Sequence, residues 1–232
     1  MVEIPLARLF YPLLLALFVA YLYARWSADR RTPWVALGRM LVQLLLVGYA
    51  LAYIFRAEQP GVVFGVLFLM AAAAGWIGLR TAIRERKRLY PFALLSILLG
   101  AGSALFVAVL LVLRPQPWFS PSVWIPLGGM AFSNGMNAVS LAAERFFAEI
   151  GEGKALSLAR AAAYKAALIP ATNSLFAVGL VSIPGLMTGQ ILAGVSPLIA
   201  ARYQILVMLM VYAAAGMSAA LFLLSARGRG MP

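Results

Sequence analysis

The stretch PFALLSILLGAGSALFVAVLLVL, residues 91–113, contains no charged side chain and decides the fold class of this sequence. A helix rising roughly 1.5 Å per residue over this stretch crosses the roughly 30 Å hydrocarbon core of a bilayer. The chain of 232 residues is 64% hydrophobic, with a mean hydropathy of +0.93, and no water-soluble core of this size needs so much apolar surface. Further apolar segments occupy residues 4–24, 34–55, 61–79, 123–143, 166–183 and 205–224. The sequence therefore predicts an all-α, polytopic membrane protein with about seven transmembrane helices.

Basic residues lie between these segments, and their number alternates from one connection to the next. Several occur in the first, third and fifth connections and in the tail: Arg25, Arg30, Arg31; Arg80, Arg84, Arg86, Lys87, Arg88; Arg145, Lys154, Arg160, Lys165; Arg227 and Arg229. The other connections carry one arginine each: Arg56, Arg114 and Arg202. Because basic loops stay in the cytosol, this pattern predicts an N-terminus outside and a C-terminus in the cytosol. The net charge of +12 is then explained by contact with anionic lipid, and no nucleic-acid partner is predicted.

The residue types that are missing exclude several functions. The sequence has no His and no Cys, which removes thiolate and imidazole metal sites, Ser–His pairs and disulfides. Its seven acidic residues fall outside the apolar segments or at their edges, so a proton relay through the membrane is disfavoured. We therefore predict no catalytic residue, no resident metal and no enzymatic activity in this chain.

Polar side chains enter the membrane mainly in the segments 123–143 and 166–183. In the first of these, Ser133, Asn137 and Ser140 share one helical stripe, with Asn134 on its flank. Such residues serve either as hydrogen-bonding glue between helices or as the lining of a substrate path, and both readings stay open. The predicted transport-pathway residues are Asn134, Asn137, Ser140, Asn173, Ser174, Thr188 and Gln190.

Two prolines and an arginine give structural expectations. Pro170 removes a backbone donor within the sixth segment, and Pro184-Gly185 is expected to end that helix near the outer face. Residues 184–198 then predict a folded outer cap with a short helix near 187–193, an ordinary extracellular loop being the alternative. In the second segment, Arg39 is expected to reach the cytosolic membrane surface and Gln43 to bond a neighbouring helix.

Three blocks of the sequence together resemble one known family. They are GRMLVQLLLVGYALAYIF (38–55), PLGGMAFSNGMNAVSL (126–141) and AALIPATNSLFAVGLVSIPGLMTGQILAGVSPLIAARYQILVM (166–208). They are similar to the FetB family of ABC-transporter permeases, which includes the bacterial iron-export permease and plant permeases linked to aluminium tolerance. The resemblance implies a single permease domain, residues 1–232, in the plasma (inner) membrane, exporting iron or another metal ion. It also implies a separate ABC ATPase that binds the ATP, and two copies of the permease in the complex.

Residues 144–165 are the one longer connection and would form the cytosolic coupling loop to that ATPase. The expected coupling residues are Glu144, Phe146, Phe147, Glu149, Ile150 and Arg160, on a short amphipathic helix broken at Gly151 and Gly153. A helix lying on the membrane surface is the alternative. The chain departs from the family by lacking a Leu-Gly-Ala-Thr stretch ahead of its Ala-Leu-Ile-Pro. As an alternative function, the chain is an ATP-independent channel or carrier for a small polar or organic solute.

Overall fold

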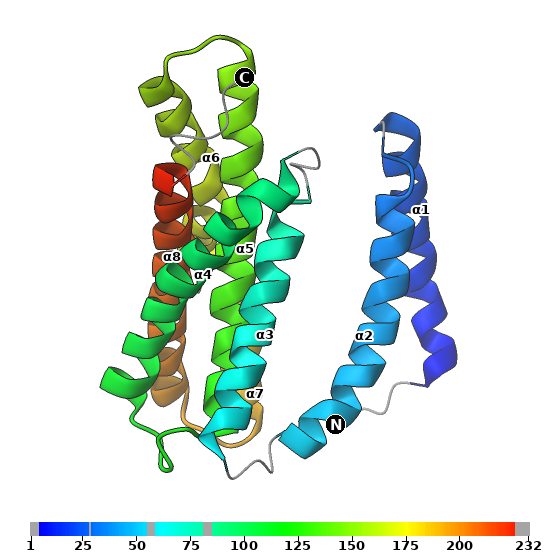
Figure 1. The fold of residues 1–232 in the computed structure, drawn as a ribbon. Coiled ribbons are helices and arrows are strands. Elements are labelled where there is room, and N and C mark those ends of the chain that lie inside the picture. Colours follow the sequence, from blue (N-terminus) through cyan, green and yellow to red (C-terminus); the bar gives the residue numbers. More distant parts are fainter. Residues whose placement is uncertain (1–4, 28, 55–58, 81–84, 226–232) are drawn as a thin grey trace. The chain divides into compact units, whose positions relative to one another are not determined.

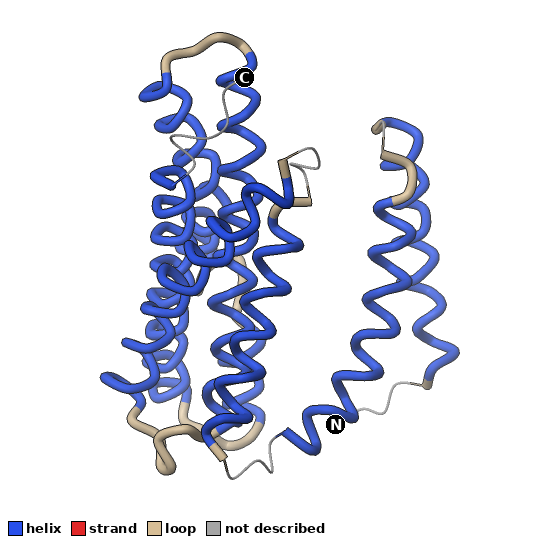
Figure 2. Tube along the Cα trace, viewed as in Figure 1, coloured by secondary structure: helices blue, strands red, loops and turns tan. Residues whose placement is uncertain are grey.

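The computed structural model describes residues 5–27, 29–54, 59–80 and 85–225, and the chain divides into two compact units, Met1–Arg56 and Ala57–Pro232. Each unit is helical throughout its regular structure (Figures 1 and 2). The first unit contains a 3₁₀ turn, Leu6–Leu9, followed by α1, Phe10–Trp26, and α2, Thr32–Ile54, which pack against each other. Between them a carboxylate oxygen of Asp29 accepts the backbone N–H groups of Arg31 and Thr32, at 3.2 and 3.1 Å, where α2 begins.

The second unit is a helical bundle. Its helices are α3, Pro60–Gly78; α4, Arg86–Phe106, continued by a π-helix, Val107–Leu113; α5, Pro121–Gly151; α6, Leu156–Ala177; α7, Gly185–Leu192; and α8, Pro197–Ser225. α8 packs against α4, α5, α6 and α7, and α3 packs against α4 and α5. The core is built largely from alanine, leucine and valine side chains of α3, α4, α5 and α8, whereas α6 buries only alanines and α7 buries no residue.

Small residues let three helices meet closely in this core. A Cβ atom added at Gly100 of α4 would lie 2.5 Å from the backbone nitrogen of Ser218 in α8. A Cβ at Gly135 of α5 would lie 2.9 Å from the hydroxyl of the same serine, which is fully buried. In bilayers, where helices gain little from hydrophobic burial against each other, such close backbone approach supplies much of the packing energy.

Five helical segments among the described residues are long and apolar enough to cross a membrane. They are Ala7–Trp26, Thr32–Tyr49, Pro60–Gly78, Arg86–Leu113 and Pro197–Ser225. The two other predicted spans, 123–143 and 166–183, fall on α5 and α6, whose serine, asparagine and charged side chains lower their hydropathy. The all-α, polytopic prediction is confirmed, whereas the number of seven spans, the orientation and the single-domain assignment stay predictions.

The predicted coupling connection, 144–165, is almost entirely helical: the helix expected before the break is present as a continuation of α5, and the coupling role stays a prediction. α5 runs on to Gly151 and α6 begins at Leu156, which leaves only residues 152–155 as a turn. The break falls where Gly151 and Gly153 predicted it, and Gly153 has a positive φ of 77°. We call residues 144–155 the hairpin tip.

Pro184-Gly185 was misassigned, because it begins a helix rather than ending one. α6 already stops at Ala177, where the backbone N–H groups of Leu180, Val181 and Ser182 all bond the carbonyl of Ala177. Pro184 is the N-cap of α7 and has the extended backbone that an N-cap residue takes, with φ −63° and ψ 139°. The short helix predicted near 187–193 is confirmed as α7.

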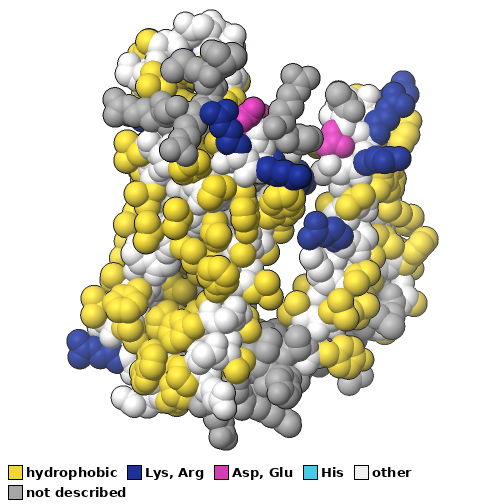
Figure 3. Space-filling model, viewed as in Figure 1, with side chains coloured by type: hydrophobic (Ala, Val, Ile, Leu, Met, Phe, Trp, Pro, Cys, Tyr) yellow, Lys and Arg dark blue, Asp and Glu magenta, His cyan; other side chains and the backbone are white. Residues whose placement is uncertain are grey.

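The hairpin tip and α7 lie at opposite ends of the second unit (Figure 1). The end of α3, the start of α4 and the end of α8 lie at the same end as the tip, so the third and fifth connections of the sequence, both basic, lie at one end of this unit. On the face shown in Figure 3, hydrophobic side chains cover the middle of this unit and charged ones lie toward its ends. Some residues named in the sequence predictions lie outside the described residues: Ile4, Phe55, Arg56, Arg84, Arg227 and Arg229.

Candidate functional site

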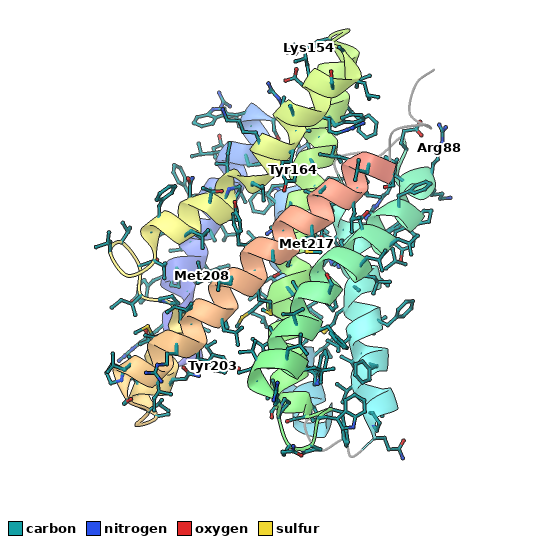
Figure 4. All side chains as sticks on the ribbon, turned by 90° about the vertical axis from the view of Figure 1, so that its left-hand side faces the viewer. Arg88, Lys154, Tyr164, Tyr203, Met208 and Met217 are labelled. Carbon is teal, nitrogen blue, oxygen red and sulfur yellow. The ribbon has the colours of Figure 1, made fainter. Side chains whose placement is uncertain are left out.

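A cavity of about 380 Å³ lies where the end of α6, the start of α7 and α8 come together. We call it the Asn173 pocket; its walls are Asn173, Ser174, Ala177, Val178, Ser182, Pro184 and Met208. Met208 lies about midway along α8 in Figure 4, on the side that faces these segments. Two predicted pathway residues, Asn173 and Ser174, are therefore brought together in one pocket, beside polar and sulfur-bearing groups from two other segments.

The chemistry of this pocket is neutral. Asn173 is exposed and offers an amide, whereas the hydroxyl of Ser174 donates to the carbonyl of Pro170 at 3.0 Å. Ser182 adds a second hydroxyl and Met208 a thioether. Neutral oxygens and a single soft sulfur make weak, exchangeable contacts with cations, which suits passage better than retention.

The polar residues of α5 form a separate set. The amide of Asn134 donates to the carbonyl of Met130 on its own helix at 2.8 Å, and the hydroxyl of Ser133 bonds the same carbonyl at 3.1 Å. Asn137 is exposed and Ser140 is half-buried. None of these four side chains is among the walls of the Asn173 pocket, so the structure divides the predicted pathway set between α5 and the α6–α7 corner.

Helix α7 holds the last two predicted pathway residues. The hydroxyl of Thr188 donates to the carbonyl of Pro184 at 3.2 Å, while the amide oxygen of Gln190 is buried without a partner among the described residues. A Cβ added at Gly185 or Gly189 would meet no described atom within 4 Å, so none of the described helices packs closely against these two glycines.

Charged side chains organise the hairpin tip at the other end. Glu149 is 3% exposed and forms ion pairs with Arg145 on its own helix and with Lys154 of the turn, at 2.5 Å for the latter. Lys154 also contacts Glu152 at 2.9 Å, and Figure 4 shows it at the extreme end of the unit. The hydrogen bond from Lys154, helped by the charge of Arg145, lowers the pKa of Glu149 against the opposing effect of burial. The same bonds raise the pKa of Lys154.

The apolar residues predicted to dock an ATPase do not all face outward. Phe146 is buried at 4% exposure and stacks edge-on against Phe147, with ring centroids 5.6 Å apart. Phe147 and Ile150 are half-buried, and Glu144 is exposed. Phe146 and Glu149 are therefore buried within this chain, and the docking role predicted for this set of residues stays a prediction. Arg160 lies on α6 beyond the turn and lines a different cavity, shared with α8.

In the first unit, Arg39 and Gln43 are both exposed side chains of α2. The roles predicted for them, at the membrane surface and between helices, stay predictions. Pro170 is likewise exposed and lies inside α6, which continues through it to Ala177.

Met208 was not identified from the sequence as part of the Asn173 pocket, nor were Arg145 and Lys154 identified as the ion-pair partners of Glu149. Met208 is distant in sequence from Asn173, and no local pattern marked it. Arg145 and Lys154 were noted only as basic residues of a loop, although their spacing of four and five from Glu149 is a recognisable ion-pair pattern on a helix and its following turn.

Comparison with known proteins assigns the chain to a family. The family described as "Uncharacterised protein family (UPF0014)" matches residues 6–229, nearly the whole sequence. The chain belongs to this family. Its UPF0014 relatives include the Synechocystis membrane protein slr1647, 38% identical over 191 residues that cover 75% of this chain and 73% of that protein.

Two further relatives have names that suggest a function. The "Probable iron export permease protein FetB" of Escherichia coli is 33% identical over 198 residues, 79% of this chain and 75% of FetB. The "Protein ALUMINUM SENSITIVE 3" of Arabidopsis thaliana is 33% identical over 199 residues, 79% of this chain and 71% of that protein. The resemblance inferred from the three sequence blocks is thus confirmed, and the chain is a multi-pass membrane protein related to permeases. No solved structure matches it.

Proposed function

We propose that this UPF0014 chain is the membrane subunit of an ABC transporter, exporting iron or another metal ion with ATP that a separate ATPase hydrolyses. The observation that carries the proposal is its 33% identity with FetB over three quarters or more of both chains. No enzymatic step is assigned to this chain. We place it in the plasma (inner) membrane as a homodimer, with its N-terminus outside and its C-terminus in the cytosol.

The hairpin tip is the proposed contact with the ATPase. It lies at the same end as the third connection of the sequence, which is also basic, and the positive-inside rule would place such connections in the cytosol. Because Glu149 is held from both sides by Arg145 and Lys154, the turn is fixed to the end of α5. A turn that is held in this way moves together with α5, so a movement of the ATPase would be transmitted to α5 and α6. The exposed Glu144 and the half-exposed Phe147 and Ile150 offer the docking surface.

The Asn173 pocket is the proposed outer part of the transport path, with Thr188 and Gln190 of α7 at its mouth. Support comes from its position beside the middle of α8, away from the tip, and from its neutral oxygen and sulfur groups. The described residues contain no cluster of three or more acidic, His or Cys side chains, so a tightly bound ion is not part of the proposal. Asn134, Asn137 and Ser140 would line the path along α5 if a second permease copy faces that side.

Co-expression tests this function directly. The chain is produced with a candidate ABC ATPase from the same organism, and the complex is purified through a tag on the permease. We expect the ATPase to copurify, and we expect Glu149→Ala to lower the permease-stimulated ATPase rate because it frees Lys154 and the turn. Glu85→Ala, which removes an exposed ion pair with Arg88 at the same end, is the matched control and should leave that rate unchanged.

Transport into vesicles distinguishes the proposed ABC transporter from the alternative, an ATP-independent channel or carrier. Inside-out vesicles holding the complex should accumulate Fe²⁺ only when ATP is supplied. Vesicles that hold the permease alone and still move Fe²⁺ or a small polar solute would instead establish an ATP-independent channel or carrier. Failure of the chain to copurify with any ABC ATPase would refute the proposal.

A further inference from the structure

A second cavity, of about 330 Å³, lies between the first turns of α6 and the last turns of α8. We call it the Arg160 pocket. Its walls include Ser157, Arg160 and Tyr164 from α6 and Ala220, Leu223 and Leu224 from α8. Tyr164 is seen in Figure 4 where α6 passes alongside α8, and its hydroxyl lies close to Gly216, where an added Cβ would be 3.4 Å away.

Arg160 is left unsatisfied in this pocket. Its Nε and one terminal nitrogen, Nη2, are buried and have no hydrogen-bond partner in the part of the chain that the structure describes. A guanidinium cannot shed its charge at any physiological pH, and a buried donor without an acceptor is costly. The two free N–H groups sit side by side on the planar fork, which is the arrangement that binds the two oxygens of a phosphate or carboxylate.

The rest of the pocket is apolar. Ala161, Ala220, Leu223 and Leu224 contribute hydrocarbon, and the hydroxyls of Ser157 and Tyr164 are the other polar groups. A small hydrated anion gains no binding free energy from apolar walls. An anion attached to a hydrocarbon chain can contact both the guanidinium and the apolar side chains.

The depth of Arg160 in the membrane fits such a ligand. The sixth apolar segment of the sequence begins at residue 166, so Arg160 stands about 9 Å outside it at roughly 1.5 Å per residue of helix. This is the level of lipid headgroups, since the interfacial layers add several ångströms on each side of the hydrocarbon core. Leu223 and Leu224 close the last apolar segment, 205–224, on the neighbouring helix, where an acyl chain would begin.

We propose that the Arg160 pocket binds the phosphate of an anionic phospholipid, with the guanidinium of Arg160 on the phosphate oxygens and an acyl chain against α8. The ligand class is a phosphate group carried on a lipid, and basic pockets between membrane helices are a known way of holding such headgroups. This site is separate from the transport function proposed above and does not depend on it. It also assigns Arg160, which the sequence grouped with the ATPase contact, to the lipid.

Native mass spectrometry of the purified full-length chain tests the site. The protein is released from micelles that contain phosphatidylglycerol or phosphatidylcholine, and the bound lipids are counted. We expect the wild-type protein to retain phosphatidylglycerol in preference to phosphatidylcholine. Arg160→Gln should lower the apparent affinity for phosphatidylglycerol roughly tenfold, as loss of charge-assisted hydrogen bonds does. Arg88→Gln makes the same charge change at an exposed position at the same end, and should alter it by less than about twofold.

A second variant probes the apolar part. Ala220→Leu narrows the cavity without touching the charge, and should weaken phosphatidylglycerol retention while Arg160 is still present. Thermal unfolding of each variant checks that it is folded. Lipid retention is compared between a variant and the wild type only where their melting temperatures agree.

Three results would overturn the proposal. Equal losses in Arg160→Gln and Arg88→Gln would mean that net charge alone attracts the lipid. Saturation of the wild-type site by inorganic phosphate, with no gain from the acyl chain, would make it a free-anion site. Loss of ATPase copurification in Arg160→Gln with lipid retention unchanged would assign the guanidinium to an acidic group of the partner protein.

Discussion

Replacing Gly100 by alanine tests whether α4 and α8 meet backbone to backbone. The added Cβ would lie 2.5 Å from the nitrogen of Ser218 and 2.8 Å from two further atoms of the α8 main chain. Ordinary contact begins near 3.4 Å, so the approach is about 0.9 Å too close. Main-chain atoms inside a helix cannot rotate out of the way, and α8 as a whole must therefore move.

The expected cost follows from comparison with a matched glycine. Overpacking in a well-packed core costs about 1–3 kcal/mol, while alanine gains up to about 1 kcal/mol of helix propensity over glycine. Gly102 lies two residues along the same helix, and a Cβ there meets no described atom within 4 Å. Because the propensity gain is common to both variants, Gly100→Ala should be less stable than Gly102→Ala by about 1–3 kcal/mol.

Reversible unfolding in mixed micelles, followed by tryptophan fluorescence, measures this difference. A double-mutant cycle then identifies the atoms in contact. Gly135→Ala clashes first with the hydroxyl of Ser218, at 2.9 Å, so Ser218→Ala should relieve it in part. The same substitution should not relieve Gly100→Ala, whose contact is with main chain. Equal stability of the Gly100 and Gly102 variants, or relief of both clashes by Ser218→Ala, would refute this packing.

Three other predictions concern charge and transport. The guanidinium of Arg86 donates to the backbone carbonyl of Trp76 at 3.0 and 2.5 Å and lies 3.8 Å from the centre of the Trp76 ring. Arg86→Ala should therefore lower the free energy of unfolding by about 1–3 kcal/mol. As a control, the free energy of unfolding of Arg88→Ala in the same micelles should stay within about 0.5 kcal/mol of wild type. The pKa of Glu149 is lowered in the folded protein, so its ion pairs stabilise the fold fully above roughly pH 4.3, the pKa of an unfolded glutamate, and this stabilisation is lost as pH falls through the lower folded pKa. The melting temperature of Glu149→Gln should therefore differ from that of wild type at pH 7 and equal it in strong acid. A difference that stays constant with pH would contradict this prediction. Asn173→Leu should reduce ATP-dependent Fe²⁺ transport in vesicles while insertion and ATPase copurification stay normal, and full transport would exclude its amide from the path.

The apolar helices were predictable because burial in lipid imposes their length and composition. The predicted segment 61–79 matches α3 at Pro60–Gly78 within a residue at each end, and the end of 91–113 matches the end of the π-helix. Boundaries failed where a helix leaves the hydrocarbon. α8 begins at Pro197 rather than near 205, since nothing in the intervening residues breaks a helix, although Arg202 and Gln204 lower the hydropathy there.

The site was predictable only where its residues are neighbours in sequence. Asn173 and Ser174 share the pocket because they are adjacent near the end of α6, whereas Met208 joins them through the packing of α8 on α6 and α7, which no local pattern specifies. Pro184 was misjudged because a proline breaks a helix that reaches it but also favours the start of the next one. The burial of Phe146 depends on how α5 packs, since periodicity groups it with Phe147 and Ile150 without saying which side faces the bundle.

The continuation of α5 to Gly151 gives this protein a lever arm. Its apolar segment ends near residue 143, so the helix projects about 12 Å further, at roughly 1.5 Å per residue, before the chain turns back into α6. A tilt of about 10° at the membrane surface would swing the far end sideways by about 2 Å over that length. Under the proposed function, an ATPase that pushes the far end sideways by about 2 Å would therefore turn the whole of α5 by about 10° without entering the hydrocarbon.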